Sequence, residues 1–157
     1  SQGYDNGIID NFISSCAKAE FLKDWKILVK LHPSEVLTWR HVHPALASNN
    51  HVEIITSGSS NWYVVNSDAV VGISSTVLFE ALAFQKPIFV LDSADSKIAE
   101  PLVSLGVACR IVNADGMVDF LENFNNMKEF DSEYYWKSNA LSNVEMLIKN
   151  EASLRSY

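Results

Sequence analysis

The sequence predicts an α/β domain that is built on a doubly wound parallel sheet. Short apolar runs alternate with segments of helical period along most of the 157 residues, with short connections between them. This order is typical of right-handed βαβ units, whose strands form a parallel sheet. The run from Ala69 to Ile73 is apolar throughout, as expected of a parallel strand that is covered on both faces. A 48% hydrophobic chain of this length can bury the core of a single domain.

The predicted strands are short runs rich in Val and Ile. These residues favour strands because their branched side chains pack well on a pleated surface. The run WKILVKL ends at His32-Pro33, and the run PIFVLD begins at Pro87. We expect strands at 25–31, 52–56, 69–73, 87–92 and 109–113.

The predicted helices fill the segments between these strands. Near the N-terminus, Ile9, Ile13 and Cys16 recur at helical spacing. Ser34 stands where an N-cap is expected, and Gly106 stands where a helix should stop. We expect helices at 4–22, 34–47, 61–66, 76–84, 98–105 and 115–124, and a long terminal helix over 132–154.

Composition weighs against several classes of function. The formal net charge is −7, which disfavours nucleic acid and anionic membranes as partners because both attract Lys and Arg. No apolar run approaches the roughly 20 residues of a membrane-spanning helix, and no secretory leader is visible. We therefore expect a cytoplasmic protein, either free or peripheral at the inner face of the membrane.

The two cysteines give no sign of a metal centre or a disulfide. Cys16 and Cys109 lie far apart in the sequence, and neither has His or Cys neighbours at metal-ligand spacing. Both are interpreted as reduced core residues. We expect neither a bound metal nor a cofactor.

Polar residues follow each predicted strand at its carboxyl end. In a doubly wound sheet, ligands bind outside the carboxyl ends of the strands. This edge is unusually rich in Ser, Thr and Gly, so a ligand site is predicted there. The segments are His32-Pro33, Thr56 to Ser60, Ser74 to Thr76, Asp92-Ser93 and Asn113 to Asp115.

Ser74, Ser75 and Thr76 form a run of hydroxyls where a predicted strand turns into a helix. The start of a helix has unpaired N–H groups and a partial positive charge, so it attracts phosphate. Gly72 allows a ligand to approach closely. The alternative is that Ser74 or Ser75 only caps the helix, which is the commoner use of Ser there. The glycine-rich motifs of dinucleotide-binding and P-loop proteins are absent.

Glu80 and His32 are further candidates for ligand binding. Glu80 lies one helical turn after Thr76 and shares its face, so its carboxylate could hold the two hydroxyls of a ribose. A solvated or capping Glu is the alternative. His32 directly follows a predicted strand, and an imidazole can donate to a phosphate or a sugar hydroxyl. The alternative is a structural His packed in the turn. His41 and His43 are interpreted as surface residues beside a kink at Pro44.

The segments KLHPSE and SDAVVGISSTVLFEALAFQKPIFVL, in this order, resemble a known family. They are similar to the C-terminal half of GT-B glycosyltransferases that build bacterial surface polysaccharides, of the sialyltransferase, capsule and teichoic-acid transferase type. The resemblance covers residues 25–112. It implies a Rossmann-like fold, which is one half of a GT-B enzyme.

The resemblance also implies roles for individual residues. In the family, an His-Pro motif and a Ser-Ser motif bind the nucleotide of a CMP- or CDP-activated donor, and they match His32-Pro33 and Ser74-Ser75. Thr76 would join the two serines in holding the phosphate. The segment FEALAFQKPIFVL also resembles the wider GT-B and UDP-GlcNAc 2-epimerase pattern, in which a Glu at the place of Glu80 contacts the ribose. Gly58, Ser59 and Ser60 would line the base pocket.

The resemblance implies that residues 1–157 form a single nucleotide-sugar-binding domain, the C-terminal fragment of a two-domain transferase. The donor would be of the CMP, CDP or UDP type. The catalytic base and the glycan acceptor site would belong to a preceding domain, so the isolated chain is expected to be inactive. His32 is the candidate for stabilising the leaving group.

Two other functions stay open. One is a UDP-GlcNAc 2-epimerase-like enzyme domain, and the other is a binding or assembly module without chemistry. The terminal helix carries Tyr134, Tyr135 and Trp136, an apolar surface that could dock the preceding domain or a second copy in a homo-oligomer.

Overall fold

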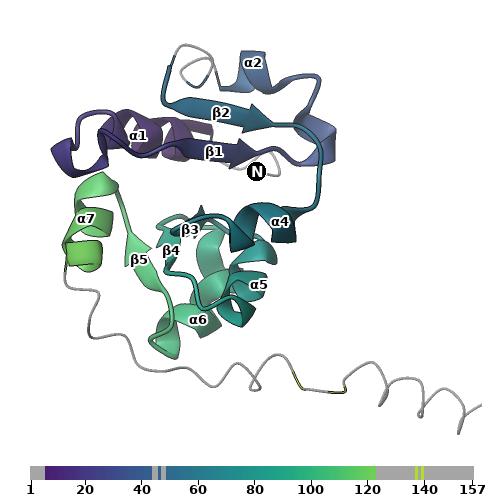
Figure 1. Cartoon of the computed structure of the whole chain (residues 1–157), viewed down its shortest axis with the longest axis vertical. Coiled ribbons are helices and arrows are strands. Elements are labelled where there is room, and N and C mark those ends of the chain that lie inside the picture. Colours follow the sequence, from purple (N-terminus) through teal and green to yellow (C-terminus); the bar gives the residue numbers. More distant parts are fainter. Residues whose placement is uncertain (1–5, 44–45, 47–48, 123–136, 138, 140–157) are drawn as a thin grey trace, which may run out of the picture.

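The computed structural model describes residues 6–43, 46, 49–122, 137 and 139, in which helices and parallel strands alternate (Figure 1). The predicted α/β class is therefore confirmed. The strands are β1 (Ile27–Lys30), β2 (Val52–Ile55), β3 (Val70–Gly72), β4 (Ile88–Leu91) and β5 (Cys109–Ile111). The α-helices are α1 (Asn6–Cys16), α2 (Trp39–Val42), α4 (Ser60–Val65), α5 (Val77–Ala83), α6 (Glu100–Ser104) and α7 (Ala114–Glu122). Short 3-10 helices are η1 (Glu20–Leu22), η2 (Pro33–Glu35) and η3 (Ser96–Ala99).

The strands form two parallel sheets. β1 pairs with β2, and β3, β4 and β5 form a sheet in that order. Within the described part of the chain, no ladder joins β1 to β3. In the three-stranded sheet Val90 is the register partner of both Gly72 and Arg110, so these residues lie in one row across the strands.

Each strand lies inside its predicted range, but three helices are shorter than predicted, among them the one expected over 98–105, which is divided between η3 and α6. The helix expected over 4–22 ends at Cys16, and the chain is extended at Ala19 before η1. The helix expected over 34–47 is divided into η2 and α2. His43 leaves the helical region (φ −129°, ψ 67°) because a residue that precedes a proline avoids it. Gly106 has the expected positive φ of 73° after α6. The helix predicted over 132–154 lies outside the described residues.

One hydrophobic core is shared by both sheets. It joins α1 and α7 to the inward faces of the strands. A second core lies on the other face of the three-stranded sheet, against α5 and α6. All four residues of β4 are buried. In β3, the strand predicted to be covered on both faces, Val71 packs against the first core and Val70 against the second, and all three residues are half-buried. In β1, by contrast, Leu28 is exposed while Ile27 and Val29 pack into the shared core.

The two sheets are inclined to each other. Cys16, at the end of α1, and Ile27, at the start of β1, line the same pocket. The neighbouring Ser15 hydroxyl accepts a hydrogen bond at 2.9 Å from the backbone N–H of Ala114, where α7 follows β5. The amino end of β1 therefore lies near the carboxyl end of β5, and Figure 1 shows β1 crossing the view while β5 runs steeply. The carboxyl end of β2 leads into α4, and Val64 of α4 packs against α5. Because α5 follows β3, this contact joins the segment after β2 to the segment after β3.

Candidate functional site

His32 turns the chain out of β1 and into η2. Its backbone is extended (φ −68°, ψ 145°), and its ring Nδ1 accepts a hydrogen bond from the backbone N–H of Ser34 at 3.3 Å. The Ser34 hydroxyl lies 2.8 Å from the same nitrogen. The buried Glu35 carboxylate accepts in return from the backbone N–H of His32 at 3.0 Å. His32 and Glu35 thus form a capping box, with Pro33 as the first residue of η2.

This capping arrangement determines which atom of His32 faces a ligand. Because Nδ1 accepts the Ser34 N–H, the neutral ring carries its proton on Nε2. His32 is exposed, and among the described residues Nε2 has no hydrogen-bond partner. The expected N-cap role of Ser34 is wrong, since the His32 ring performs it. His32 combines the structural role with an outward N–H donor.

One serine of the hydroxyl run after β3 bonds to the start of α5. The Ser75 hydroxyl accepts a hydrogen bond from the backbone N–H of Val77 at 3.2 Å, but the N-cap of α5 is Thr76, whose side chain makes no capping hydrogen bond. Ser75 and Thr76 are exposed, and Ser74 is half-buried. An acceptor hydroxyl keeps its own proton available for a ligand.

Gly72 lies in tight contact with α5 in this turn. A Cβ at Gly72 would lie 3.1 Å from the Leu78 side chain, and Leu78 is a buried residue of α5. The glycine therefore lets α5 approach β3 closely, and it fixes the place of the hydroxyl run above the strand.

Glu80 is half-buried on α5, one turn after Thr76. Its backbone N–H bonds to the Thr76 carbonyl at 3.1 Å. Within the described part of the chain, its carboxylate forms neither a hydrogen bond nor an ion pair, so the capping alternative for Glu80 receives no support. A partly buried acceptor without a partner is a suitable group for ligand hydroxyls.

The loop after β2 has a fixed shape. Gly58 has a φ of +88°, a conformation that favours glycine. A Cβ there would lie 3.2 Å from the Tyr63 ring of α4. Ser59 is exposed and Ser60 is half-buried at the start of α4. The predicted base-pocket residues therefore form a defined, accessible loop beside α5.

Sequence reasoning placed Asp92 and Ser93 at the ligand edge but missed the charged cluster that they join at the carboxyl end of the three-stranded sheet. Arg110 of β5 donates from Nη1 to Asp92 at 3.0 Å and to Ser96 at 2.6 Å. Its Nη2 donates to Glu100. Ser96 is buried and donates to the Ser93 carbonyl at 2.8 Å. A signal was available, because an arginine in the short apolar run CRIVN needs partners if its guanidinium is partly buried.

His43 is also misplaced by the sequence interpretation. It was expected at the surface, but its side chain is 1% exposed. Its Nδ1 lies 3.4 Å from Oδ1 of Asp10 on α1, and neither atom has a hydrogen-bond partner in the described structure. His43 therefore packs the turn after α2 against α1.

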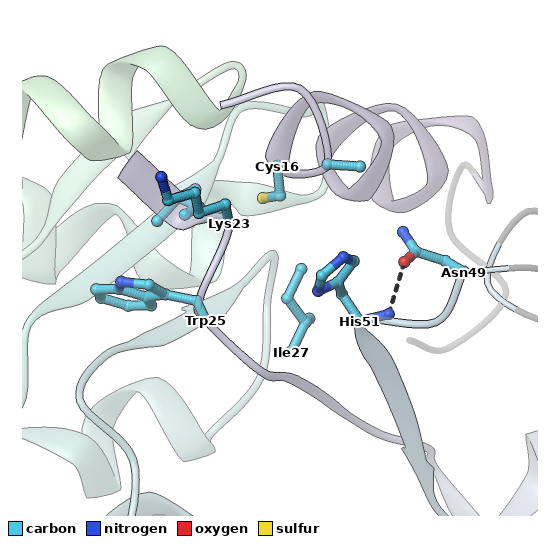
Figure 2. Close-up of a pocket in the computed structure, with 8 residues that line it drawn as sticks. Cys16, Lys23, Trp25, Ile27, Asn49 and His51 are labelled. Atoms are coloured by element: carbon cyan, nitrogen blue, oxygen red, sulfur yellow. Dashed lines mark hydrogen bonds between the residues drawn. The ribbon is translucent and has the colours of Figure 1, made fainter. Parts of the chain in front are cut away.

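A pocket of about 100 Å³ opens at the amino end of β1. Figure 2 shows the His51 imidazole and the Trp25 indole on either side of it, with Cys16 above. The Asn49 side chain accepts from the backbone N–H of His51 at 2.9 Å. Burial raises the pKa of the Cys16 thiol to about 11, against a smaller lowering by a backbone hydrogen bond. The Cys16 thiol, which lines the pocket, is therefore protonated at neutral pH and does not act as a nucleophile there.

The raised pKa of Cys16 predicts slow thiol chemistry and a loss of stability at alkaline pH. In a Cys109→Ser background, iodoacetamide should modify Cys16 slowly at pH 7.5, with a rate that rises about tenfold per pH unit. The raised folded pKa stabilises the protein below pH 9.0, the ordinary value, and this stabilisation is lost as the pH rises towards 11. As the pH rises between these two values, the free energy of unfolding measured in urea should fall by about 1–2 kcal/mol more for the Cys109→Ser parent than for the same protein with Cys16→Ala. Equal pH dependence of both proteins would contradict the assignment.

Neither a metal site nor a membrane span is found in the part of the chain that the structure describes. No group of three or more His, Cys, Asp or Glu side chains could hold a metal ion there. No helix among the same residues has the length and apolar character to cross a bilayer.

Comparisons with known proteins give no match. No family model matches this chain, and searches of curated proteins and of solved structures find no significant relative. The functional proposal below therefore depends on the residues and contacts described above.

Proposed function

We propose that this chain is a nucleotide-sugar-binding domain of the glycosyltransferase type, built as a Rossmann-like, doubly wound half of a GT-B enzyme of surface-polysaccharide synthesis. The observation that carries the proposal is the placement of the candidate groups. His32 follows β1 of the two-stranded sheet, and the run from Ser74 to Thr76 follows β3 of the three-stranded sheet. Each is separated by one residue from the carboxyl end of its parallel strand, the end where such sheets bind ligands.

The free polar atoms suit the parts of a nucleotide. The outward Nε2–H of His32 can donate to a phosphate oxygen, and the exposed hydroxyls of Ser75 and Thr76 can do the same. The Glu80 carboxylate can accept from both hydroxyls of a ribose. Gly58 and Ser59 border the space where the base would lie, because α4 packs against α5.

The proposed chemistry is the departure of a nucleotide from an activated sugar. As the sugar–oxygen bond breaks, negative charge grows on the leaving phosphate. A donor N–H on His32 and the hydroxyl run would stabilise that charge. The glycan hydroxyl that attacks, and the base that deprotonates it, would be bound by another domain of the same enzyme.

A titration of nucleotides tests the proposal. Isothermal calorimetry with cytidine, CMP, CDP, uridine and UDP should show that at least one nucleotide binds, and that each added phosphate strengthens binding. A phosphate held by charge-assisted hydrogen bonds should improve affinity about tenfold over the nucleoside. Absence of binding by all five compounds would refute the donor-binding function and favour an assembly module.

A further inference from the structure

We propose that Asp92, held in position by Arg110, accepts hydrogen bonds from hydroxyl groups of the sugar that the nucleotide carries. This inference rests on the proposed function and adds a residue that determines sugar specificity. It starts from the charged cluster at the end of β4, which none of the motifs in the sequence includes.

The register places Asp92 at the same end of the sheet as the hydroxyl run. Gly72 of β3 and Val90 of β4 are partners in the ladder, and Ser74 and Asp92 each follow two residues later. The turns that contain Ser74 and Asp92 therefore leave the carboxyl ends of two adjacent strands, which lie about 4.8 Å apart. Val90 packs into the core against α5, and Asp92, two residues on, starts from the same face as α5 and its Glu80.

Arg110 fixes the Asp92 carboxylate on one side only. Its Nη1 binds Oδ1 of Asp92 at 3.0 Å and is itself held by the buried hydroxyl of Ser96 at 2.6 Å. Glu100 holds the other arm of the guanidinium. Oδ2 of Asp92 has no partner among the described residues, and the side chain is 55% exposed. An oriented anionic acceptor therefore opens to solvent at the edge.

A sugar hydroxyl is the ligand group that this acceptor fits. Arg110 is shared by Asp92 and Glu100, so the cluster keeps one net negative charge, which disfavours a phosphate at Asp92 and favours an uncharged hydroxyl group. Ionised carboxylates make strong hydrogen bonds with hydroxyl donors. With the phosphate at Ser75, Glu80 on α5 and Asp92 on β4 would take hydroxyls from two separate parts of the ligand.

The test compares bare and sugar-bearing nucleotides on matched variants. Asp92→Asn should weaken binding of CMP-N-acetylneuraminate, CDP-glucose or UDP-glucose, whichever the parent protein binds, by about five- to tenfold. It should leave CMP, CDP or UDP unchanged or slightly tighter, because one negative charge near the phosphate is gone. Asp95→Asn, in the same loop and also exposed, is the control and should change neither affinity.

Arg110 is tested as a positioning residue by a double-mutant cycle. Arg110→Met should weaken the sugar-bearing form and add nothing in the Asp92→Asn background, because it acts through Asp92. If Arg110→Met does not fold, Glu100→Gln loosens the same clamp from its exposed end and should give a smaller loss that is likewise absent in the Asp92→Asn background. Equal effects of Asp92→Asn on bare and sugar-bearing forms, or no effect on either, would overturn the inference while the donor-binding function stands. Absence of all nucleotide binding by the parent would remove both.

Discussion

Replacing Phe89 by alanine is expected to lower the free energy of unfolding by about 3–5 kcal/mol. Phe89 lies in the middle of β4, is fully buried, and stacks edge-on against Phe120 of α7 with ring centroids 5.3 Å apart. Removing the ring leaves a cavity between the three-stranded sheet and α7, which the surrounding strands cannot fill without breaking their ladder. Urea unfolding followed by circular dichroism measures the change.

Phe84→Ala is the matched control for this experiment. Phe84 ends α5 and is 37% exposed, so its removal should cost about 1 kcal/mol or less. Similar losses for the two variants would contradict the placement of the core around β4.

Ser75→Ala is expected to lower the affinity for a bound nucleotide about ten- to a hundredfold, because it removes a hydroxyl that donates to a charged phosphate. It should also cost about 1 kcal/mol of stability through loss of the hydrogen bond from the backbone N–H of Val77. The corresponding nucleoside, which lacks phosphate, should bind the variant as it binds the parent. Glu80→Gln should instead weaken nucleoside and nucleotide about equally, since both contain the ribose.

Calorimetric titration of the parent and both variants separates these cases, with Ser14→Ala on the exposed face of α1 as a control. Equal losses for nucleoside and nucleotide in Ser75→Ala would remove the phosphate assignment. Unchanged binding of both would leave Ser75 with only its hydrogen bond to Val77.

The strands were predictable because their signal is local. The run IFVL is apolar throughout, and the run VEII is apolar except for Glu53. Such short apolar runs can be recognised from neighbouring residues alone, without knowledge of any distant contact. Which strands become neighbours depends on packing between distant segments. Helical and strand periods alone therefore predicted the α/β class and the strands, but not the division of the described strands into two parallel ladders that share a core.

The sequence predicted the positions of candidate site residues only where these positions follow from the local order of strands and helices. His32, Ser75 and Glu80 lie where the order of strands and helices placed them. The His32 cap was missed because Ser is the usual capping residue and His is not. The clamp on Arg110 was missed because its partners come from other elements, and the distances in it depend on the register of β4 and β5.

The hydrogen bond between Ser15 and Ala114 joins positions 99 residues apart, and this has a consequence for how the chain folds during synthesis. The shared core draws its buried side chains from Phe12 at one end to Met117 at the other. A ribosome delivers the chain from its N-terminus at about 5–20 residues per second, so α1 emerges several seconds before α7 does. Until then the apolar face of α1 has no complete surface to pack against. We therefore expect nascent chains that end before β5 to bind chaperones through Phe12, Ile13 and Cys16, and this binding should end once α7 has emerged.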